Sequence, residues 1–298
     1  ILTRLLPLKE PRFTFRFATN LSPATWFASP STRVNQSTPK VDNAPPKNWT
    51  RNMNRIEVCF SPGEYHLYEA DFQLIVVLDV LRATSAICTA MEYGVKEIIP
   101  VATLEEARNH QAKGVLVAAE RGGQIVKGFD LGNSPYSYMN PELKGQTVVL
   151  TTTNGTKAIN MAKTKDTVVV GSLNNLDALC TWLIEQNRDT LILGSGWKDK
   201  FNLEDTICAG AIADKCLESG LFFADEDSSV AAKFIFRSSR ENMFAFLKAS
   251  SHRRRLRKLN LNEDVKYCLT PNNCTAIPIL KNGSLVRMNH ETIENAAI

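Results

Sequence analysis

The sequence lacks several patterns that would place it at once in a protein class. No apolar run reaches the roughly 18 residues typical of a membrane-spanning helix, so we expect no membrane partner. The seven cysteines include no CxxC pair, which argues against a zinc site or a thioredoxin-like redox pair. A Gly-Lys-Ser/Thr phosphate loop is absent, and Gly194-Ser195-Gly196 lacks the third glycine of a dinucleotide loop. The simplest expectation is a cytoplasmic protein with reduced, mostly buried thiols.

A basic surplus is also missing from the part of the chain that we expect to fold. The formal charge is +4, but residues 1–52 hold eight Lys or Arg against two acids, which leaves 27 basic and 29 acidic residues beyond them. A nucleic-acid interface would need a basic surface on the folded domain, so we expect no nucleic-acid partner. The basic run His252–Lys258 is interpreted as the solvated face of a helix.

Residues 1–52 differ in composition from everything that follows them. Pro, Ser, Asn, Thr and Arg dominate this stretch, and no hydrophobic periodicity persists before Met53. Three explanations stay open: upstream sequence joined to a start at Met53, which we favour, a transit-like leader, or a disordered tail. We expect the folded region to cover 53–290, as one unit or as two lobes of about 53–160 and 161–290, with a tail at 291–298.

From Met53 onward, apolar strands alternate with helices. The continuous apolar runs Leu74–Val80 and Thr167–Val170 are typical of strands that are buried on both faces. Their alternation with helical patterns predicts an α/β fold with α/β/α layers and a mostly parallel sheet. Near the C-terminus, Asn282-Gly283 separates two apolar runs and predicts an antiparallel hairpin, which we expect at the edge of the sheet.

Three times an apolar strand runs into a short polar loop that is followed by a helix. These loops lie at 79–85, 151–156 and 194–205. Open α/β sheets bind ligands at the carboxyl ends of their strands, and the free N–H groups of a helix start attract anions. Because the loops also carry hydroxyls, an Arg and several acids, they favour phosphate chemistry.

In the first loop, Asp79 ends its strand, so its carboxylate is expected at the sheet edge. Arg82 can pair with a phosphate, and the hydroxyls of Thr84 and Ser85 can bind an anion. The alternative is purely structural: a helix N-cap with a surface ion pair.

A second acidic and basic pair, Glu120-Arg121, stands next to Gly122-Gly123, where the backbone can approach a ligand closely. The polar loop that comes next holds three more candidates: Asp130, Asn133 and Ser134. A turn built from Asp, Gly, Asn and Pro would explain this loop structurally. Its nearness to Glu120-Arg121 favours a role in binding.

The loop at 151–156 is the most polar of the strand ends. Asn154-Gly155 permits a positive φ angle, which can form a backbone nest for an anion. A capped helix start would explain Thr153 or Thr156 alone, but not the whole run of polar residues.

Acids spread over several loops suggest a metal. The candidate ligands are Asp79, Glu120, Asp130, Glu204 and Asp205. Mg²⁺ favours a few carboxylates plus water and substrate phosphate, so scattered acids fit it better than they fit zinc. The chain has four histidines and none lies in these loops, which weakens Ser-His-Asp and histidine-nucleophile schemes.

Taken together, five motifs resemble the 2-phosphosulfolactate phosphatase (ComB-like) family. The resemblance runs in order and spacing from about Ile56 to Met288. The motifs are Asp-Val-Leu-Arg-Ala-Thr-Ser (79–85), Glu-Arg-Gly-Gly (120–123), Gly-Phe-Asp-Leu-Gly-Asn-Ser-Pro (128–135), Thr-Thr-Thr-Asn-Gly-Thr (151–156) and Glu-Asp (204–205).

The resemblance implies an α/β phosphatase that depends on Mg²⁺. Its reaction would hydrolyse the phosphate ester of 2-phosphosulfolactate to sulfolactate, a step of coenzyme M biosynthesis. The partner is then a small anionic phosphorylated substrate, and a homo-oligomer stays open. Two other functions also stay open: a phosphatase of another phosphorylated metabolite, and a non-catalytic module that binds a phosphorylated ligand.

The loops then divide into roles. The catalytic candidates are Asp79, Arg82, Glu120 and Arg121. The substrate-binding candidates are Thr84, Ser85, Asn133, Ser134, Thr153, Asn154, Gly155 and Thr156. The sequence leaves open which acids bind Mg²⁺, and whether water or Asp79 attacks the phosphate.

Overall fold

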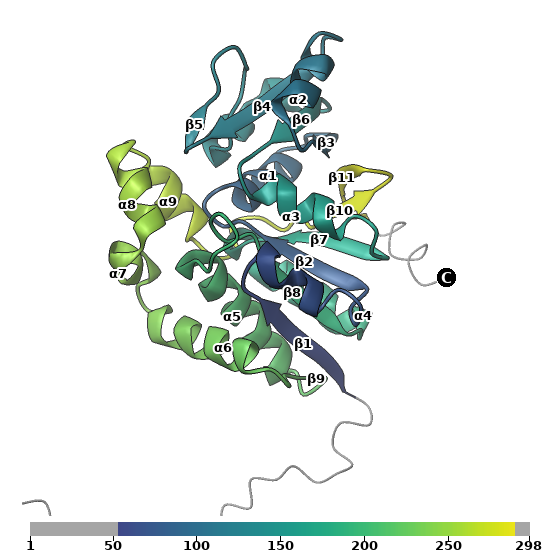
Figure 1. The fold of residues 1–298 in the computed structure, drawn as a ribbon, viewed down its shortest axis with the longest axis vertical. Coiled ribbons are helices and arrows are strands. Elements are labelled where there is room, and N and C mark those ends of the chain that lie inside the picture. Colours follow the sequence, from purple (N-terminus) through teal and green to yellow (C-terminus); the bar gives the residue numbers. More distant parts are fainter. Residues whose placement is uncertain (1–52, 290–298) are drawn as a thin grey trace, which may run out of the picture. The chain divides into compact units, whose positions relative to one another are not determined.

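The computed structural model describes residues 53–289, so the predictions for 1–52 and 291–298 lie outside the described residues. The α/β class and the mostly parallel sheet are confirmed (Figure 1). The strands are β1 (Asn54–Cys59), β2 (Leu74–Leu78), β3 (Glu97–Pro100), β4 (Leu116–Arg121), β5 (Gln124–Ile125), β6 (Thr147–Thr151), β7 (Thr167–Gly171), β8 (Thr190–Gly194), β9 (Phe222–Phe223), β10 (Pro278–Lys281) and β11 (Ser284–Arg287). The α-helices are α1 (Ala83–Glu92), α2 (Leu104–Gln111), α3 (Gly155–Ala162), α4 (Leu176–Gln186), α5 (Leu203–Glu218), α6 (Asp227–Ser239), α7 (Met243–Phe246), α8 (Ser251–Lys258) and α9 (Asn262–Cys268).

The strands form one sheet in the order β5-β4-β6-β3-β11-β10-β7-β2-β8-β1-β9. The predicted hairpin, β10 with β11, is present, but its expected place at the edge is wrong, because it lies between two groups of parallel strands. Ile279 of β10 pairs with Val169, and Leu285 of β11 pairs with Ile98, both antiparallel. The hairpin thereby covers the edges of β7 and β3, which would otherwise present unpaired backbone groups.

Three antiparallel pairings separate β7 from β3, so the two parallel groups run in opposite senses. One group is β4, β6 and β3, and the other is β7, β2, β8, β1 and β9. Strands from 53–160 and from 161–290, the two lobes we considered, share this one sheet.

Helices cover both faces of the larger strand group. Alternate residues of β2 point to opposite sides: Val76 packs in a cluster with α4 and α5, whereas Val77 packs in a cluster with α1 and α3. All five residues of β2 are buried, which explains the continuous apolar run in the sequence. Each such side chain contributes roughly 1.5–3 kcal/mol on burial, so the core places this strand and the loop that follows it.

The segment after β9 is helical, and its helix α8 lies beside the turn between β4 and β5. A Cβ atom on Gly123 would lie 2.8 Å from a methyl carbon of Leu259, just after α8, and 3.4 Å from one of Leu256 within α8. Ser250 caps α8 by accepting the N–H of Arg253 at 3.3 Å. Within 53–289, none of the helices has the length and apolar character needed to cross a bilayer.

Candidate active site

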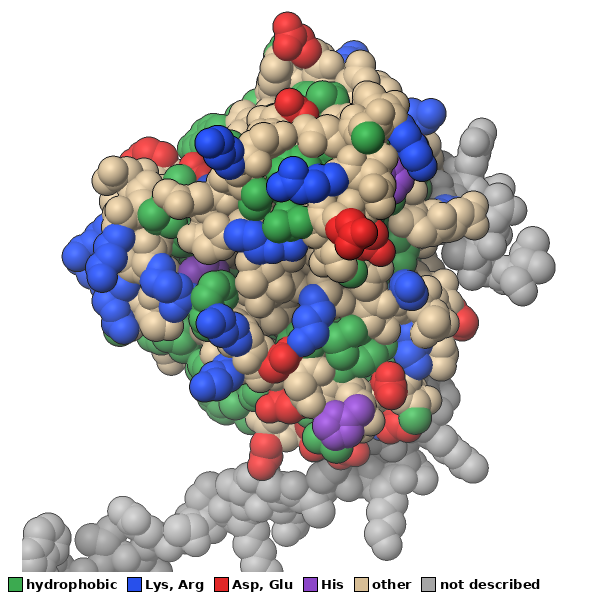
Figure 2. All heavy atoms as spheres, turned by 45° about the horizontal axis from the view of Figure 1, so that its top comes forward, with side chains coloured by type: hydrophobic (Ala, Val, Ile, Leu, Met, Phe, Trp, Pro, Cys, Tyr) green, Lys and Arg blue, Asp and Glu red, His purple; other side chains and the backbone are tan. Residues whose placement is uncertain are grey.

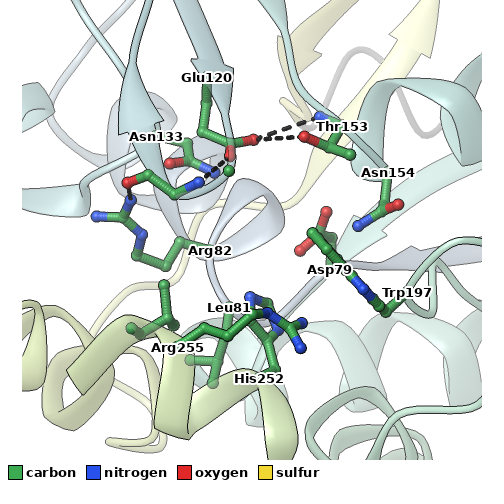
Figure 3. A pocket seen from close by; sticks show the side chains of 13 residues that line it. Asp79, Leu81, Arg82, Glu120, Asn133, Thr153, Asn154, Trp197, His252 and Arg255 are labelled. Atoms are coloured by element: carbon green, nitrogen blue, oxygen red, sulfur yellow. Dashed lines mark hydrogen bonds between the residues drawn. The ribbon is translucent and has the colours of Figure 1, made fainter. Parts of the chain in front are cut away.

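A small cavity of about 120 Å³ lies where the polar loops meet α8 (Figure 3). Loops from both parallel groups reach it, together with the loop after β8. Its lining consists of Asp79, Leu81, Arg82, Glu120, Gly122, Gly123, Asn133, Thr153, Asn154, Trp197, His252, Arg255 and Leu256. The volume suits part of a small metabolite.

Asp79 follows the last residue of β2 and is 8% exposed. Thr84 fixes the turn after it: its hydroxyl accepts the Asp79 N–H at 3.0 Å, and its own N–H donates to the Asp79 carbonyl at 2.9 Å. The Ser85 hydroxyl donates to the Val80 carbonyl at 2.9 Å. Thr84 and Ser85 are therefore engaged in holding the loop, and neither lines the cavity.

Burial raises the pKa of Asp79 to about 6, with repulsion from Glu120 and Glu204 adding to the effect and His252 opposing it. The ionised carboxylate is thus held in a dry, acid-rich place, where it would be stabilised by a cation. Such strongly perturbed carboxylates are typical of functional sites.

Asp205 lies beneath this loop and ties three segments together. Its carboxylate accepts the Val80 N–H at 2.8 Å, the Gly196 N–H at 3.1 Å and the Asn202 side-chain amide at 2.8 Å. Burial, followed by repulsion from Asp79 and Glu204, raises its pKa well above the ordinary value. Through these hydrogen bonds, Asp205 fixes the position of the loop after β2 relative to the loop after β8.

Glu204 is 1% exposed and is paired across to α8. Its Oε1 lies 2.6 Å from Nδ1 of His252, and the Ser250 hydroxyl donates to its Oε2 at 3.3 Å. Glu204, which we predicted as a metal ligand, is therefore hydrogen-bonded to His252, a residue that was not predicted from the sequence to belong to the site.

Glu120 joins two loops across the top of the cavity in Figure 3. It accepts the Gly123 N–H through one carboxylate oxygen, and the N–H and hydroxyl of Thr153 through the other, both at 3.3 Å. Arg121 turns the other way. Its guanidinium donates to the Glu120 carbonyl at 2.6 Å and to the Thr151 hydroxyl at 3.1 Å, and it lines a neighbouring hollow of about 410 Å³ instead.

Arg82 is 4% exposed and is already paired. Its guanidinium bonds to the Asp264 carboxylate on α9 and donates to the Gly123 carbonyl at 2.7 Å. It lines the cavity, but its charge is neutralised within the protein. A sequence gives no sign of such a pairing across 182 residues.

The loop after β6 divides into a cavity wall and a helix start. Thr153 and Asn154 line the cavity. Thr156 and Thr152 bond to each other, with the Thr156 hydroxyl accepting the Thr152 N–H at 3.2 Å and the Thr152 hydroxyl accepting the Thr156 N–H at 3.1 Å. The side of Gly155 that would carry a Cβ faces the side chain of Asp79.

Replacing Gly155 by Ala should disturb the site directly. The new Cβ would stand 2.7 Å from the Ala83 Cβ and 2.9 Å from Oδ2 of Asp79, so one of these groups must move. We expect a loss of about 1–3 kcal/mol in the free energy of unfolding and of about tenfold or more in turnover. Denaturant unfolding and phosphate release measure the two effects. Gly63→Ala, whose Cβ would meet Asp199 at an ordinary 3.4 Å, is the matched control, and equal effects in both variants would contradict the prediction.

The three candidate residues of the polar loop at 128–135 lie in different surroundings. Asn133 lines the cavity, and its Oδ1 is buried without a hydrogen-bond partner among the described residues. Ser134 lies on a hollow next to the cavity, together with Arg82 and Gly123. Asp130 is exposed and is not part of the cavity wall.

Three side chains of the wall that can carry chemistry, Trp197, His252 and Arg255, were not predicted as site residues from the sequence. The interpretation of 252–258 as a solvated face is wrong for its inner side. Arg253 is 7% exposed and lies 3.7 Å over the Phe244 ring, while His252, Arg255 and Leu256 line the cavity. The available signal was the apolar Leu256, because residues three and four positions apart share one helix face.

Oxygen atoms are the metal ligands that this cavity offers. In the described part of the chain, no three His, Cys, Asp or Glu side chains gather as a ready-made metal site. Asp79, Glu120 and Asn133, whose Oδ1 has no partner among the described residues, nevertheless line the same cavity. Hard oxygen donors of this kind suit Mg²⁺ better than they suit zinc, which favours sulfur and nitrogen ligands.

Comparisons with known proteins agree on one family. The family model described as 2-phosphosulpholactate phosphatase matches residues 59–283, which include every residue of the cavity wall. A probable 2-phosphosulfolactate phosphatase of Caldanaerobacter subterraneus subsp. tengcongensis is 40% identical over 221 residues, covering 73% of this chain and 91% of that protein. Proteins with the same name in Thermotoga maritima and Clostridium acetobutylicum are 39% and 32% identical, covering 71% and 78% of this chain and 90% and 100% of their own lengths. The chain therefore belongs to the 2-phosphosulfolactate phosphatase family and is a hydrolase of phosphoric monoesters.

Proposed function

We propose that this cavity hydrolyses the phosphate ester of 2-phosphosulfolactate, or of a similar small phosphorylated hydroxy acid, in a reaction that depends on Mg²⁺. The products would be sulfolactate, as in coenzyme M biosynthesis, and phosphate. The observation that carries the proposal is the buried Asp79 carboxylate, which lines a small cavity within the region that the family model matches.

Asp79 is the first candidate to hold the metal, with Glu120 and the Asn133 side-chain oxygen beside it. The fit is chemical: the pKa of Asp79 is raised to about 6 by burial and by neighbouring acids, and Asn133 presents a buried acceptor without a partner among residues 53–289. Both features are expected where a cation completes the charge balance. When bound, Mg²⁺ would neutralise phosphate oxygens and raise the electrophilicity of the phosphorus.

The protein's own groups would hold and orient the ester. Thr153 and Asn154 lie at the cavity wall. The N–H and hydroxyl of Thr153 already donate to Glu120, so the side-chain amide of Asn154 is the donor that we assign to the phosphate. His252 is held by Glu204 at 2.6 Å, and no described residue takes its second ring nitrogen. We assign His252 the role of donating a proton to the departing alkoxide oxygen.

The seven cysteines support a cytoplasmic setting for the reaction. All seven lie within the described residues, and each is buried as a free thiol. Reducing compartments preserve such thiols, and burial further raises the pKa of Cys59 and of Cys268 to about 12.

Removal of divalent metal should abolish turnover. We expect EDTA to lower phosphate release from 2-phosphosulfolactate by at least about 100-fold, and excess Mg²⁺ to restore it, because an uncompensated phosphate would face Asp79 and Glu120. Phosphate release from an aryl phosphate and from a panel of phosphorylated hydroxy acids, each with and without EDTA, makes the measurement.

The outcomes of this experiment separate the alternatives. Metal-dependent release from another member of the panel, with none from 2-phosphosulfolactate, would support a different phosphorylated metabolite. Binding of phosphorylated ligands without turnover of any ester would support the non-catalytic module. Full activity in EDTA would contradict the metal assignment.

A further inference from the structure

The basic side chains of the cavity wall are not equally available to a substrate. Arg82 is neutralised by Asp264, and His252 is paired with Glu204. Arg255 is the third, and in the part of the chain that the structure describes it has no carboxylate within ion-pair distance. The helix that carries it was interpreted as solvated, yet this residue faces inward.

The Arg255 guanidinium is held in a defined position by a ring. Its Cζ lies 4.1 Å from the centre of the Trp197 ring, which itself lies 5.6 Å from the His252 ring. Backbone hydrogen bonds between Trp197 and Lys200, at 2.8 and 3.1 Å, fix the turn that presents the tryptophan. A guanidinium stacked on an aromatic face leaves its N–H edge free to bind an oxyanion.

One nitrogen of this edge has no partner. Nη2 of Arg255 is buried without any hydrogen bond among the described residues, while Nη1 makes a single long contact of 3.5 Å to the Ser251 hydroxyl. Burial lowers the pKa of the guanidinium, and Glu204 opposes this effect. A buried, incompletely bonded cation is costly, and an anion beside it would remove that cost.

The neighbours on α8 behave differently. Figure 2 shows basic side chains gathered on the side of the molecule that carries this helix, and the exposed members on α8 are Arg254, Arg257 and Lys258. In Figure 3, Arg255 and His252 lie on the α8 side of the cavity, opposite Glu120 and Asn133. Arg255 thus lies across the cavity from Glu120 and Asn133, two of the residues that we assign to the metal.

We propose that Arg255, stacked on Trp197, binds the acid group of the substrate that lies away from the reacting phosphate. This inference rests on the proposed function, because 2-phosphosulfolactate carries a carboxylate and a sulfonate in addition to its phosphate. Arg255 is then the residue by which the enzyme distinguishes phosphorylated hydroxy acids from simple phosphate esters. Its contact supplies specificity, while Asp79 and its neighbours handle the phosphate.

The test compares three phosphate esters in the full chain with Mg²⁺. An aryl phosphate carries no acid group, 2-phospholactate adds a carboxylate, and 2-phosphosulfolactate adds a carboxylate and a sulfonate. In Arg255→Met, we expect the preference for 2-phosphosulfolactate over the aryl phosphate, measured as a ratio of kcat/KM values, to fall about 10- to 100-fold. A fall with 2-phospholactate as well identifies the carboxylate as the bound group, whereas a fall confined to 2-phosphosulfolactate identifies the sulfonate.

Two further variants complete the experiment. Arg257→Met makes the same chemical change on the exposed side of α8 and should leave all three kcat/KM values within about threefold of wild type. Arg255→Lys keeps the charge but loses the planar fork, so its preference should lie between those of wild type and Arg255→Met. Thermal unfolding verifies that each variant is folded.

Failure of this inference can be told from failure of the proposed function. If wild type prefers the acid-bearing esters and Arg255→Met keeps that preference, the assignment of Arg255 is wrong while the function stands. Equal losses on all three esters would also overturn it, since Arg255 would then serve the phosphate or the fold. If wild type turns over the aryl phosphate but neither acid-bearing ester, the proposed substrate is wrong and the inference falls with it.

Discussion

Asp79→Asn is expected to lower turnover by at least about 100-fold while the protein stays folded. The substitution keeps the shape of the side chain but removes the charge that we assign to metal binding at the centre of the cavity. Burial raises the pKa of this carboxyl from 3.8 to about 6, so the ionised form is disfavoured by the fold. That cost appears as the pH rises through this interval and is fully present at pH 7. Without metal, the free energy of unfolding of the variant at pH 7 should therefore be at least as large as that of metal-free wild type, as measured by denaturant unfolding.

The control for this variant lies at the other end of the same strand. Asp71 precedes β2, is more than half exposed and forms a 3.7 Å ion pair with Arg55. Asp71→Asn should leave turnover within about threefold and stability within about 0.5 kcal/mol of wild type. A near-normal rate in Asp79→Asn would refute the central assignment, and a large loss of stability in that variant would show that the carboxylate supports the fold instead.

The sequence predicted the elements that carry strong hydrophobic periodicity. Strands β2 and β7 differ from their predicted ranges by two residues or fewer, because strands that are buried on both faces leave a continuous apolar signal. The hairpin was predicted from Asn282-Gly283, but its partners were not. Local turn chemistry specifies that two strands pair, whereas the position of the pair in a sheet depends on which other edges are free.

The site was predictable only where it is built from strand ends. Asp79, Thr153 and Asn154 follow strands and Glu120 lies at the carboxyl end of β4, where the rule for open α/β sheets places ligand sites. Asp264, Trp197 and Arg255 come from helices and a turn that pack over this edge, and no local pattern predicts where such segments dock. Thr84, Ser85 and Thr156 show the converse, since hydroxyls that could bind an anion are taken up by the start of their own helices.

Arg82→Met is expected to have the second large effect, on stability as well as on turnover. Asp264 is 10% exposed as a side chain, so removal of its partner leaves a buried charge uncompensated. We expect a loss of about 3–5 kcal/mol in the free energy of unfolding and of at least about 100-fold in turnover. Glu263→Gln breaks the exposed Lys266 ion pair on the same helix, and should change stability by about 0.5 kcal/mol or less.

The double variant Arg82→Met, Asp264→Asn separates the two roles of Arg82. Removing the carboxylate charge along with its partner should recover most of the stability lost in Arg82→Met, because no buried charge then remains unpaired. Turnover should stay low, since Arg82 also lines the cavity and donates to the Gly123 carbonyl at 2.7 Å, a contact that methionine cannot make. If turnover returns together with stability, the loss in the single variant came from the fold alone. Arg82 would then have only a structural role, linking the loop after β2 to α9, and its assignment as a catalytic residue would be wrong.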